Sequence, residues 1–130
     1  MEEVILQMTR TAILQKTREI LANEKYWAKE KFITQKITED ELFLAYCLIG
    51  AMNKAISDNN DLSVNSHQEA QCILLNIIQK KYNNKRYTSL ISFNDEEERT
   101  HLDIIELLDE GIVKSIAMNH EEAAKENPNV

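Results

Sequence analysis

Hydrophobic residues recur every three or four positions in four stretches of the chain, which is the spacing of an amphipathic helix. These stretches cover residues 2–23, 42–57, 66–81 and 95–118. The third has the cleanest apolar stripe, and its members are Ala70, Ile73, Leu74, Ile77 and Ile78. The pattern therefore predicts a mainly α fold, a single-domain bundle of about four helices.

Local signals mark where these helices begin and where they leave room for neighbours. Thr38 and Glu41 fit a capping box, in which each side chain binds a free backbone N–H of the first helical turn. Ser66 and Glu69 repeat this spacing before the third helix. Gly50, within the second helix, would let another element approach closely.

The segments between the helices are short. Residues 25–37 break the helical pattern and are interpreted as a connection with aromatic anchors, among them Trp27. Residues 87–93 are β-branched and aromatic, so at most one short extended segment or strand is expected. A lone strand is not stable, so it either packs on the helices or pairs with a second copy. Residues 119–130 are expected to form a frayed acidic tail behind a helical domain of residues 1–118.

Composition supports a helical fold and narrows the function. The chain has only two glycines and one proline, too few for the tight turns of an all-β fold or for a glycine-rich phosphate loop. Its net charge of −7 disfavours binding to nucleic acid or to an anionic membrane surface. No apolar run is long enough to cross a membrane, and the acidic N-terminus is unlike a signal peptide. We therefore expect a cytoplasmic protein with no nucleic-acid or membrane partner.

Residues that commonly hold metals or act as nucleophiles are present, but their spacing does not suit that chemistry. The three histidines, His67, His101 and His120, form no His-x-x-x-His pair, and Cys47 and Cys72 are too far apart for a zinc motif. Both cysteines are expected to be buried thiols. No metal, no cofactor and no enzymatic activity are predicted.

The stretch from Phe93 to His101 concentrates groups that bind partners or ligands. Asn94 or Asp95 can cap the helix that follows, and Arg99 lies four residues after Asp95, at the spacing of a helical ion pair. These local roles do not explain why aromatic, donor and acceptor groups are so dense here, as in a binding hot spot. The candidate binding residues are Phe93, Asn94, Asp95, Arg99, Thr100, His101 and the distant Trp27.

Charge is uneven around this stretch. Residues 95–110 hold eight acids and a single basic residue, Arg99, whereas residues 80–86 hold four basic residues and no acid. Such polarity can steer a charged partner or a second copy of the chain, so a homodimer is a further expectation.

Three short motifs resemble an uncharacterised family of small helical bacterial and phage proteins. They are Trp27, the run Cys47-Leu48-Ile49-Gly50-Ala51, and Phe93-Asn94-Asp95 followed by Arg99-Thr100. The resemblance covers about residues 12–113. This chain has Phe93 where tryptophan is usual, and it lacks the glycine-rich stretch after Trp27. The family has no established activity, so the resemblance implies a helical fold and singles out these residues.

The leading hypothesis is a non-enzymatic protein-interaction module that binds and modulates or inhibits a partner enzyme. Residues 121–126 are similar to the glutamate-rich export signal of bacterial type IV secretion, which implies a secreted effector or its regulator. The first alternative is a small-ligand-binding protein with a pocket near Trp27, Asn94, Asp95 and Arg99. The second is a hydrolase that uses Asp95 and His101.

Overall fold

The computed structural model describes residues 8–58, 64–82 and 87–126. In these ranges the protein is mainly helical, as predicted, but it has five α-helices rather than about four, and a two-stranded sheet. The elements are α1 (Arg10–Ile20), the 3-10 helix η1 (Glu24–Tyr26), β1 (Ile33–Ile37), β2 (Leu42–Tyr46), α2 (Leu48–Asp58), α3 (Val64–Lys81), α4 (Leu90–Asp95) and α5 (His101–Glu126).

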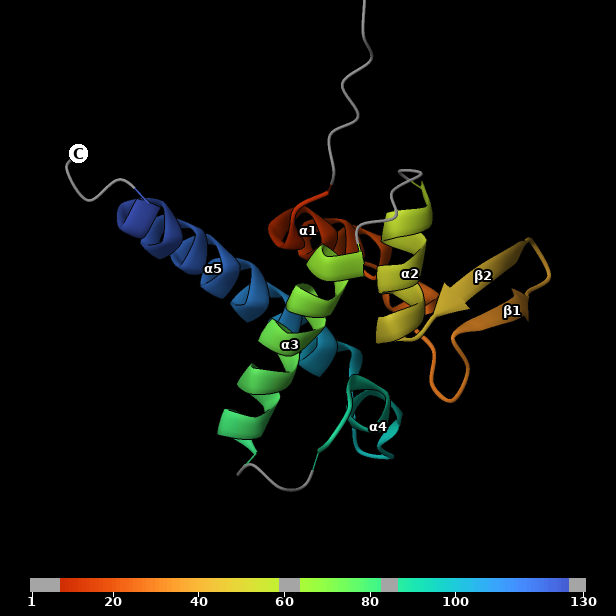
Figure 1. The fold of residues 1–130 in the computed structure, drawn as a ribbon. Helices are drawn as coiled ribbons and strands as arrows, with labels where there is room; N and C mark the ends of the chain where they lie inside the picture. Colours follow the sequence, from red (N-terminus) through yellow and green to blue (C-terminus); the bar gives the residue numbers. More distant parts are fainter. Residues whose placement is uncertain (1–7, 59–63, 83–86, 127–130) are drawn as a thin grey trace, which may run out of the picture.

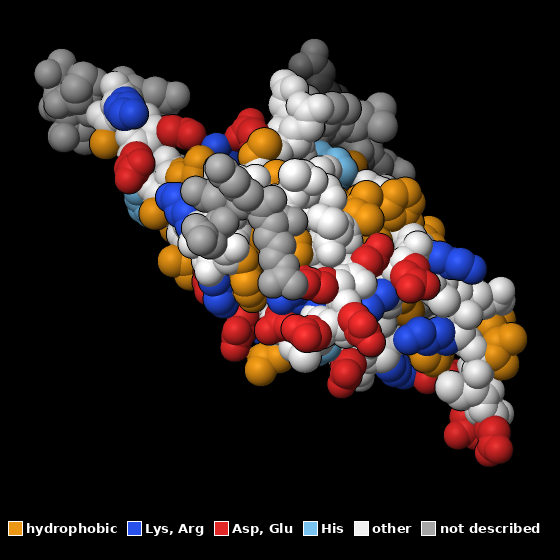
Figure 2. Space-filling model, turned by 90° about the horizontal axis from the view of Figure 1, so that it is seen from below, with side chains coloured by type: hydrophobic (Ala, Val, Ile, Leu, Met, Phe, Trp, Pro, Cys, Tyr) orange, Lys and Arg blue, Asp and Glu red, His pale blue; other side chains and the backbone are white. Residues whose placement is uncertain are grey.

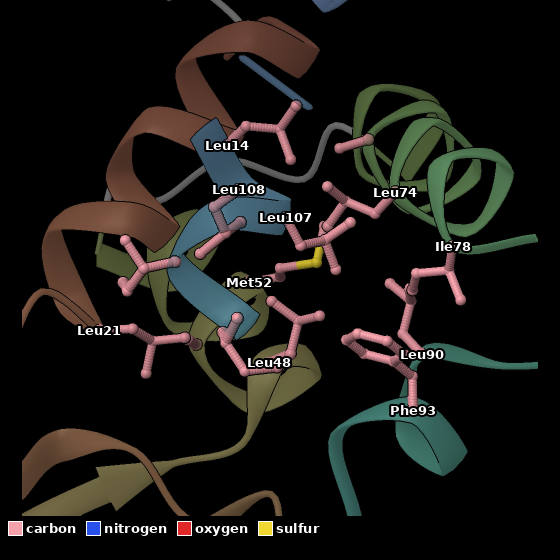
Figure 3. Close-up of a cluster of buried hydrophobic side chains, with 14 of the residues drawn as sticks. Leu14, Leu21, Leu48, Met52, Leu74, Ile78, Leu90, Phe93, Leu107 and Leu108 are labelled. Atoms are coloured by element: carbon pink, nitrogen blue, oxygen red, sulfur yellow. The ribbon is translucent and has the colours of Figure 1, made fainter. Parts of the chain in front are cut away.

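The hydrophobic core lies where α1, α2, α3 and α5 meet, and α4 packs on α2 and α3. Figure 3 shows side chains from all five helices pointing toward one another, among them Leu14, Met52, Leu74, Phe93 and Leu108. The β1–β2 hairpin projects from this helical body, and α5 extends past it on the other side (Figure 1). None of the described helices is both long and apolar enough to cross a membrane.

The long helices differ from the prediction mainly at their ends. α1 begins at Arg10, capped by the Thr9 hydroxyl, which accepts from the Ala12 N–H at 3.0 Å. Residues 2–7 of the predicted helix lie outside the described ranges. α3 begins at Val64 and ends at Lys81, so its end is as predicted. The predicted cap at Ser66 is wrong, because this residue already lies inside the first turn.

The C-terminal helix does not fray at residue 119, as the sequence had suggested, but continues to Glu126. It is held by α1, where Arg10 donates to the Asn119 side chain at 2.9 Å and to Glu122 at 2.9 Å. In this part of α5, α1 covers the side of the helix that carries Ser115, whose hydroxyl forms a hydrogen bond with that of Thr11. Val113 and Ile116, which are apolar residues of the stretch predicted as a helix at 95–118, are therefore exposed.

The predicted capping box at Thr38 and Glu41 closes a hairpin instead of opening a helix. The Thr38 N–H donates to the Glu41 carbonyl at 2.8 Å, and the Glu41 N–H donates to the Thr38 hydroxyl at 3.1 Å. The strands on either side pair antiparallel, with Ile33 opposite Tyr46 and Ile37 opposite Leu42. The prediction of at most one strand is therefore wrong, and the second long helix begins only at Leu48.

The strand predicted at residues 87–93 is a helix in the structure. The Ser89 hydroxyl accepts from the Ser92 N–H and caps α4, whose Leu90 and Phe93 turn into the core. The acids at 95–98 do not open α5, because the chain leaves the helical conformation between Asp95 and His101.

Gly50 confirms that a neighbour approaches the second long helix closely. A Cβ added at Gly50 would overlap the Phe32 carbonyl oxygen and lie 2.8 Å from its carbon. The chain entering β1 thus lies directly on α2, where any larger residue would displace it.

Candidate functional site

The structure brings all seven candidate residues into one region, at the base of the hairpin. Trp27 follows η1, three residues come from α4, and the remaining three lie at or just before the start of α5. The Trp27 indole N–H reaches 67 positions along the chain to donate to the Asn94 side chain at 2.7 Å. We call this group of residues the base cluster; its members are Trp27, Phe93, Asn94, Asp95, Arg99, Thr100 and His101.

Asn94 is the centre of the base cluster, and its side chain is fully buried. Its Oδ1 accepts from the Trp27 Nε1 and from the Leu48 backbone N–H at 3.1 Å. Its Nδ2 donates to the Ala28 carbonyl at 3.0 Å and to Asp95 Oδ1 at 2.9 Å. One amide therefore joins α4 to the chain before β1 and to the first residue of α2.

A second set of bonds holds the turn that leads into β1. Asp95 Oδ1 accepts from the Glu30 backbone N–H at 2.8 Å. Glu30 has a φ of 73°, a left-handed conformation that is costly for a residue with a side chain. Lys29 Nζ donates to the backbone carbonyls of Glu96 and Glu97, at 2.7 and 3.1 Å. The last residue of α4 and the two residues after it thus fix a strained turn at the base of the hairpin.

Arg99 connects α4 to the start of α5. Its guanidinium carbon lies 3.6 Å from the centre of the Phe93 ring, and its Nε donates to the Phe93 carbonyl at 2.9 Å. Its Nη2 donates to the Tyr87 hydroxyl at 2.8 Å and to Glu96 at 2.9 Å. The Tyr87 hydroxyl also donates to Glu96. A planar, delocalised cation suits this combination of stacking and hydrogen bonding.

Thr100 and Asp103 form the capping box of α5. The Thr100 N–H donates to Asp103 Oδ2 at 3.0 Å, and the Asp103 N–H donates to the Thr100 hydroxyl at 3.2 Å. Burial tends to raise the pKa of Asp103, but the hydrogen bonds from Thr100 and the charge of Arg99 outweigh burial and lower it. His101 Nε2 lies 2.6 Å from the Leu21 carbonyl; because a carbonyl only accepts, this nitrogen carries a proton.

The base cluster offers few free groups to a ligand or partner. Phe93 is 1% exposed, so a partner that docks on the described surface does not touch its ring. Every buried side-chain nitrogen and oxygen of the described residues has a hydrogen-bond partner within the protein. Asp95 and His101, the pair considered for a hydrolase, each bind a backbone group. The geometry is that of an internal anchor.

A cavity of about 410 Å³ lies elsewhere, between α2, α3 and the start of α4. It is lined by Ile49, Leu75, Leu90 and Ile91 together with Gln68, Gln71, Cys72, Thr88 and Ser89. None of the base-cluster residues lines it. Cys72 was predicted to be buried but is exposed here.

Cys47 is buried as predicted and occupies the junction between β2 and α2. Its sulfur accepts from the Gly50 N–H at 3.3 Å, and burial raises the pKa of its thiol. No group of three or more histidine, cysteine or acidic side chains is arranged to hold a metal ion within the described ranges.

The sequence interpretation missed an exposed apolar surface on the hairpin. Side chains opposite one another in an antiparallel pair share a face, and the register therefore places five exposed residues together. We call this surface the hairpin face; its members are Ile33, Gln35, Ile37, Leu42 and Leu44. Figure 2 shows hydrophobic side chains exposed along the hairpin and acidic side chains at its tip. Residues 33–37 and 42–44 show no regular alternation of apolar and polar residues, because Gln35 interrupts the first segment and the second is apolar throughout, so the sequence carries no clear signal for this face.

Comparison with curated proteins and with solved structures finds no match. The model of a family of unknown function (DUF6197) matches residues 6–114 of the chain. The match includes the whole range over which the sequence resembled an uncharacterised family. The chain therefore belongs to this family of unknown function.

Proposed function

We propose that the protein is a non-enzymatic interaction module that uses the hairpin face to bind another protein. The observation that carries this proposal is the exposure of four aliphatic side chains together on one projecting element. Ile37 is 79% exposed and Leu42, directly opposite it, is 60% exposed. Contiguous exposed apolar side chains are typical of protein-binding surfaces.

The base cluster supports this role because it fixes the hairpin before any partner binds. Asn94 and Asp95 hold both the chain entering β1 and the start of α2 through hydrogen bonds. A surface that is already ordered loses less conformational entropy on binding. The base-cluster residues were expected to contact a partner themselves. We propose instead that they orient the hairpin face, which makes the contact.

The charges around the hairpin face indicate the chemistry of the partner. Glu39 and Asp40 are exposed at the tip, and Lys31 is exposed at the base. A complementary partner presents an apolar surface with basic residues where the tip docks. A projecting hairpin fits a concave surface such as an enzyme cleft, and modulating or inhibiting such an enzyme is the role that we propose.

Affinity capture from the cells that produce the protein tests this function. The test variant carries Ile37→Lys and Leu44→Lys on the hairpin face. The matched control carries Val113→Lys, which changes a side chain that is 69% exposed on α5. We expect the partner to be lost with the test variant and kept with the control, since a buried lysine at an apolar contact is costly. A partner retained by a folded test variant contradicts the proposal.

A second candidate function is small-ligand binding in the cavity between α2, α3 and α4. Its volume of about 410 Å³ falls in the range of ligand sites, and its lining combines apolar side chains with a few amide and hydroxyl groups. A metabolite that occupies it raises the melting temperature of the protein. Leu75→Trp, which fills this space, should remove the shift, whereas the Ile37→Lys, Leu44→Lys variant should keep it.

A further inference from the structure

One edge of the hairpin has unpaired backbone groups. In an antiparallel pair, the backbone groups of alternate residues point toward the other strand or away from it. The bonds from Thr38 N to Glu41 O and from Cys47 N to Phe32 O show that the even-numbered residues of β1 face β2. The N–H and carbonyl groups of Ile33, Gln35 and Ile37 therefore point outward.

This outer edge of β1 is open within the described part of the chain. No hydrogen bond from outside the hairpin reaches the backbone of Ile33, Gln35 or Ile37 there. The outer edge of β2 is covered at one end, where the Ala28 N–H donates to the Tyr46 carbonyl at 2.9 Å. The hairpin also projects from the helices (Figure 1), so β1 is accessible.

Two devices that protect an edge strand, proline and a bulge, are absent from β1. Proteins commonly place proline, a bulge or a charged side chain, often lysine, on such edges to prevent pairing with another chain. β1 has no proline, and its register with β2 is continuous from Ile33 to Ile37. Its one charged side chain, Lys36, lies on the face opposite the hairpin face and reaches toward the Trp27 carbonyl at 3.5 Å.

The sequence around β1 is complementary to itself in one antiparallel register. When Gln35 faces Gln35 of a second copy, Ile33 faces Ile37 and Lys31 faces Glu39 of that copy. Lys31 and Glu39 are both exposed, and neither forms an ion pair with another described residue. A shift of two residues in either direction places an isoleucine opposite Gln35 and a charged residue opposite the other isoleucine.

We propose that β1 pairs antiparallel with β1 of a second copy, centred on Gln35, to form a four-stranded sheet. The outward backbone groups of Ile33, Gln35 and Ile37 then bond to the same residues of the other chain. Two Lys31–Glu39 pairs close the ends of the contact. The two hairpin faces become one continuous surface, but the pairing itself does not depend on whether that surface binds another protein.

Charge reversal in the purified full-length chain tests the register. We expect the wild type to sediment as a dimer, and we expect Lys31→Glu or Glu39→Lys alone to raise the dimer dissociation constant about tenfold, because each creates two like-charged pairs. An equimolar mixture of the two single variants should restore the dimer, because every charge then faces its opposite across the contact. Failure of the mixture to restore the dimer overturns the proposed register.

Removal of the central N–H tests the strand pairing independently of charge. Gln35→Pro removes a donor that points to solvent in the monomer, a position where an edge strand tolerates proline. We expect this variant to be monomeric with an unchanged circular dichroism spectrum, whereas Gln35→Thr, which keeps the N–H, stays dimeric. A monomeric wild type, or a dimer that persists in Gln35→Pro, overturns the proposal. If the wild type is monomeric but captures another protein, the strand pairing is overturned and the proposed function is still supported.

Discussion

At the scale of single residues, Asn94 determines how the hairpin is joined to the helices. Its amide makes four hydrogen bonds in a fully buried position, to Trp27, Ala28, Leu48 and Asp95. Buried polar groups that lose their partners are costly, because they cannot return to water without opening the structure. The stability of this region therefore depends on one side chain rather than on many equivalent contacts.

Replacing Asn94 should destabilise the whole fold. Asn94→Ala leaves the Trp27 N–H, the Leu48 N–H and the Ala28 carbonyl without partners, so we expect the free energy of unfolding to fall by about 3 kcal/mol. Urea unfolding followed by the fluorescence of Trp27, the single tryptophan, measures this. Asn53→Ala, at an exposed site on α2, should change the value by no more than about 0.5 kcal/mol. A loss below about 1 kcal/mol in Asn94→Ala would contradict the anchoring role.

Asp103 should contribute to the loss of stability in acid. Its pKa is lowered in the folded protein from an ordinary value of 3.8, so the stability that it contributes is present above that pH and is lost as the pH falls through the folded pKa. We expect Asp103→Asn to make the free energy of unfolding fall less steeply between about pH 5 and pH 2. Chemical unfolding at several pH values measures the slope, and an Asp103→Asn variant whose slope equals that of the wild type would contradict this role.

The candidate residues were found because an internal anchor and a binding surface use the same residue types. Aromatic rings, amides and a guanidinium gathered in a short stretch indicated a dense set of contacts, and the structure brings all seven residues together. The sequence did not indicate that their polar atoms bind the chain itself, since Phe93 and Arg99 become buried only when the rings of Tyr82 and Tyr87 pack against them. The sequence thus predicted that these residues make many contacts, but it did not predict that their partners lie within the chain.

At the scale of elements, local sequence signals identified residues that do contact each other, but in two places they predicted the wrong secondary structure. The Thr38 hydroxyl accepts from the Glu41 N–H as predicted, but the Thr38 N–H donates to the Glu41 carbonyl and not to its side chain. The two residues close a turn, because a side chain that accepts a backbone N–H serves helix caps and turns alike. Residues 87–93 have strand-forming side chains, yet the Ser89 cap and the burial of Leu90 and Phe93 favour a short helix. α3 was predicted almost completely. Its apolar stripe is long and regular, so no other secondary structure competed with the helix in this part of the chain.

The close approach between α2 and the chain entering β1 should make the two glycines of the protein respond differently to the same change. In Gly50→Ala the new methyl group meets the Phe32 backbone, which cannot move without distorting the hairpin, so we expect a loss of about 2 kcal/mol or more. In Gly111→Ala it meets the flexible end of Leu74 at 2.6 Å, and the gain in helix propensity, about 1 kcal/mol, offsets the clash. Thermal unfolding of both variants measures the difference; equal losses would contradict the backbone contact.

At the scale of the whole molecule, stability and binding are assigned to different parts. The helices and the base cluster pack most of their large apolar side chains around one core, although Leu102, Val113 and Ile116 of α5 stay exposed. The hairpin leaves Ile33, Ile37, Leu42 and Leu44 exposed on one face, and it leaves the backbone of β1 unpaired along its outer edge. The base cluster uses buried hydrogen bonds to hold the hairpin in place, but the hairpin itself adds little to the stability of the fold. This arrangement favours a role of the hairpin in recognition.

The measurement that tests this division most directly is site-specific photo-crosslinking in the producing cells. A photoreactive residue at position 37 lies on the hairpin face, and the same residue at position 113 is an equally accessible control on α5. The account predicts an adduct with another protein from position 37 and none from position 113, besides the adduct of twice the chain mass that strand pairing would give. An adduct formed only at position 113, or at both positions with equal yield, would contradict the assignment of binding to the hairpin.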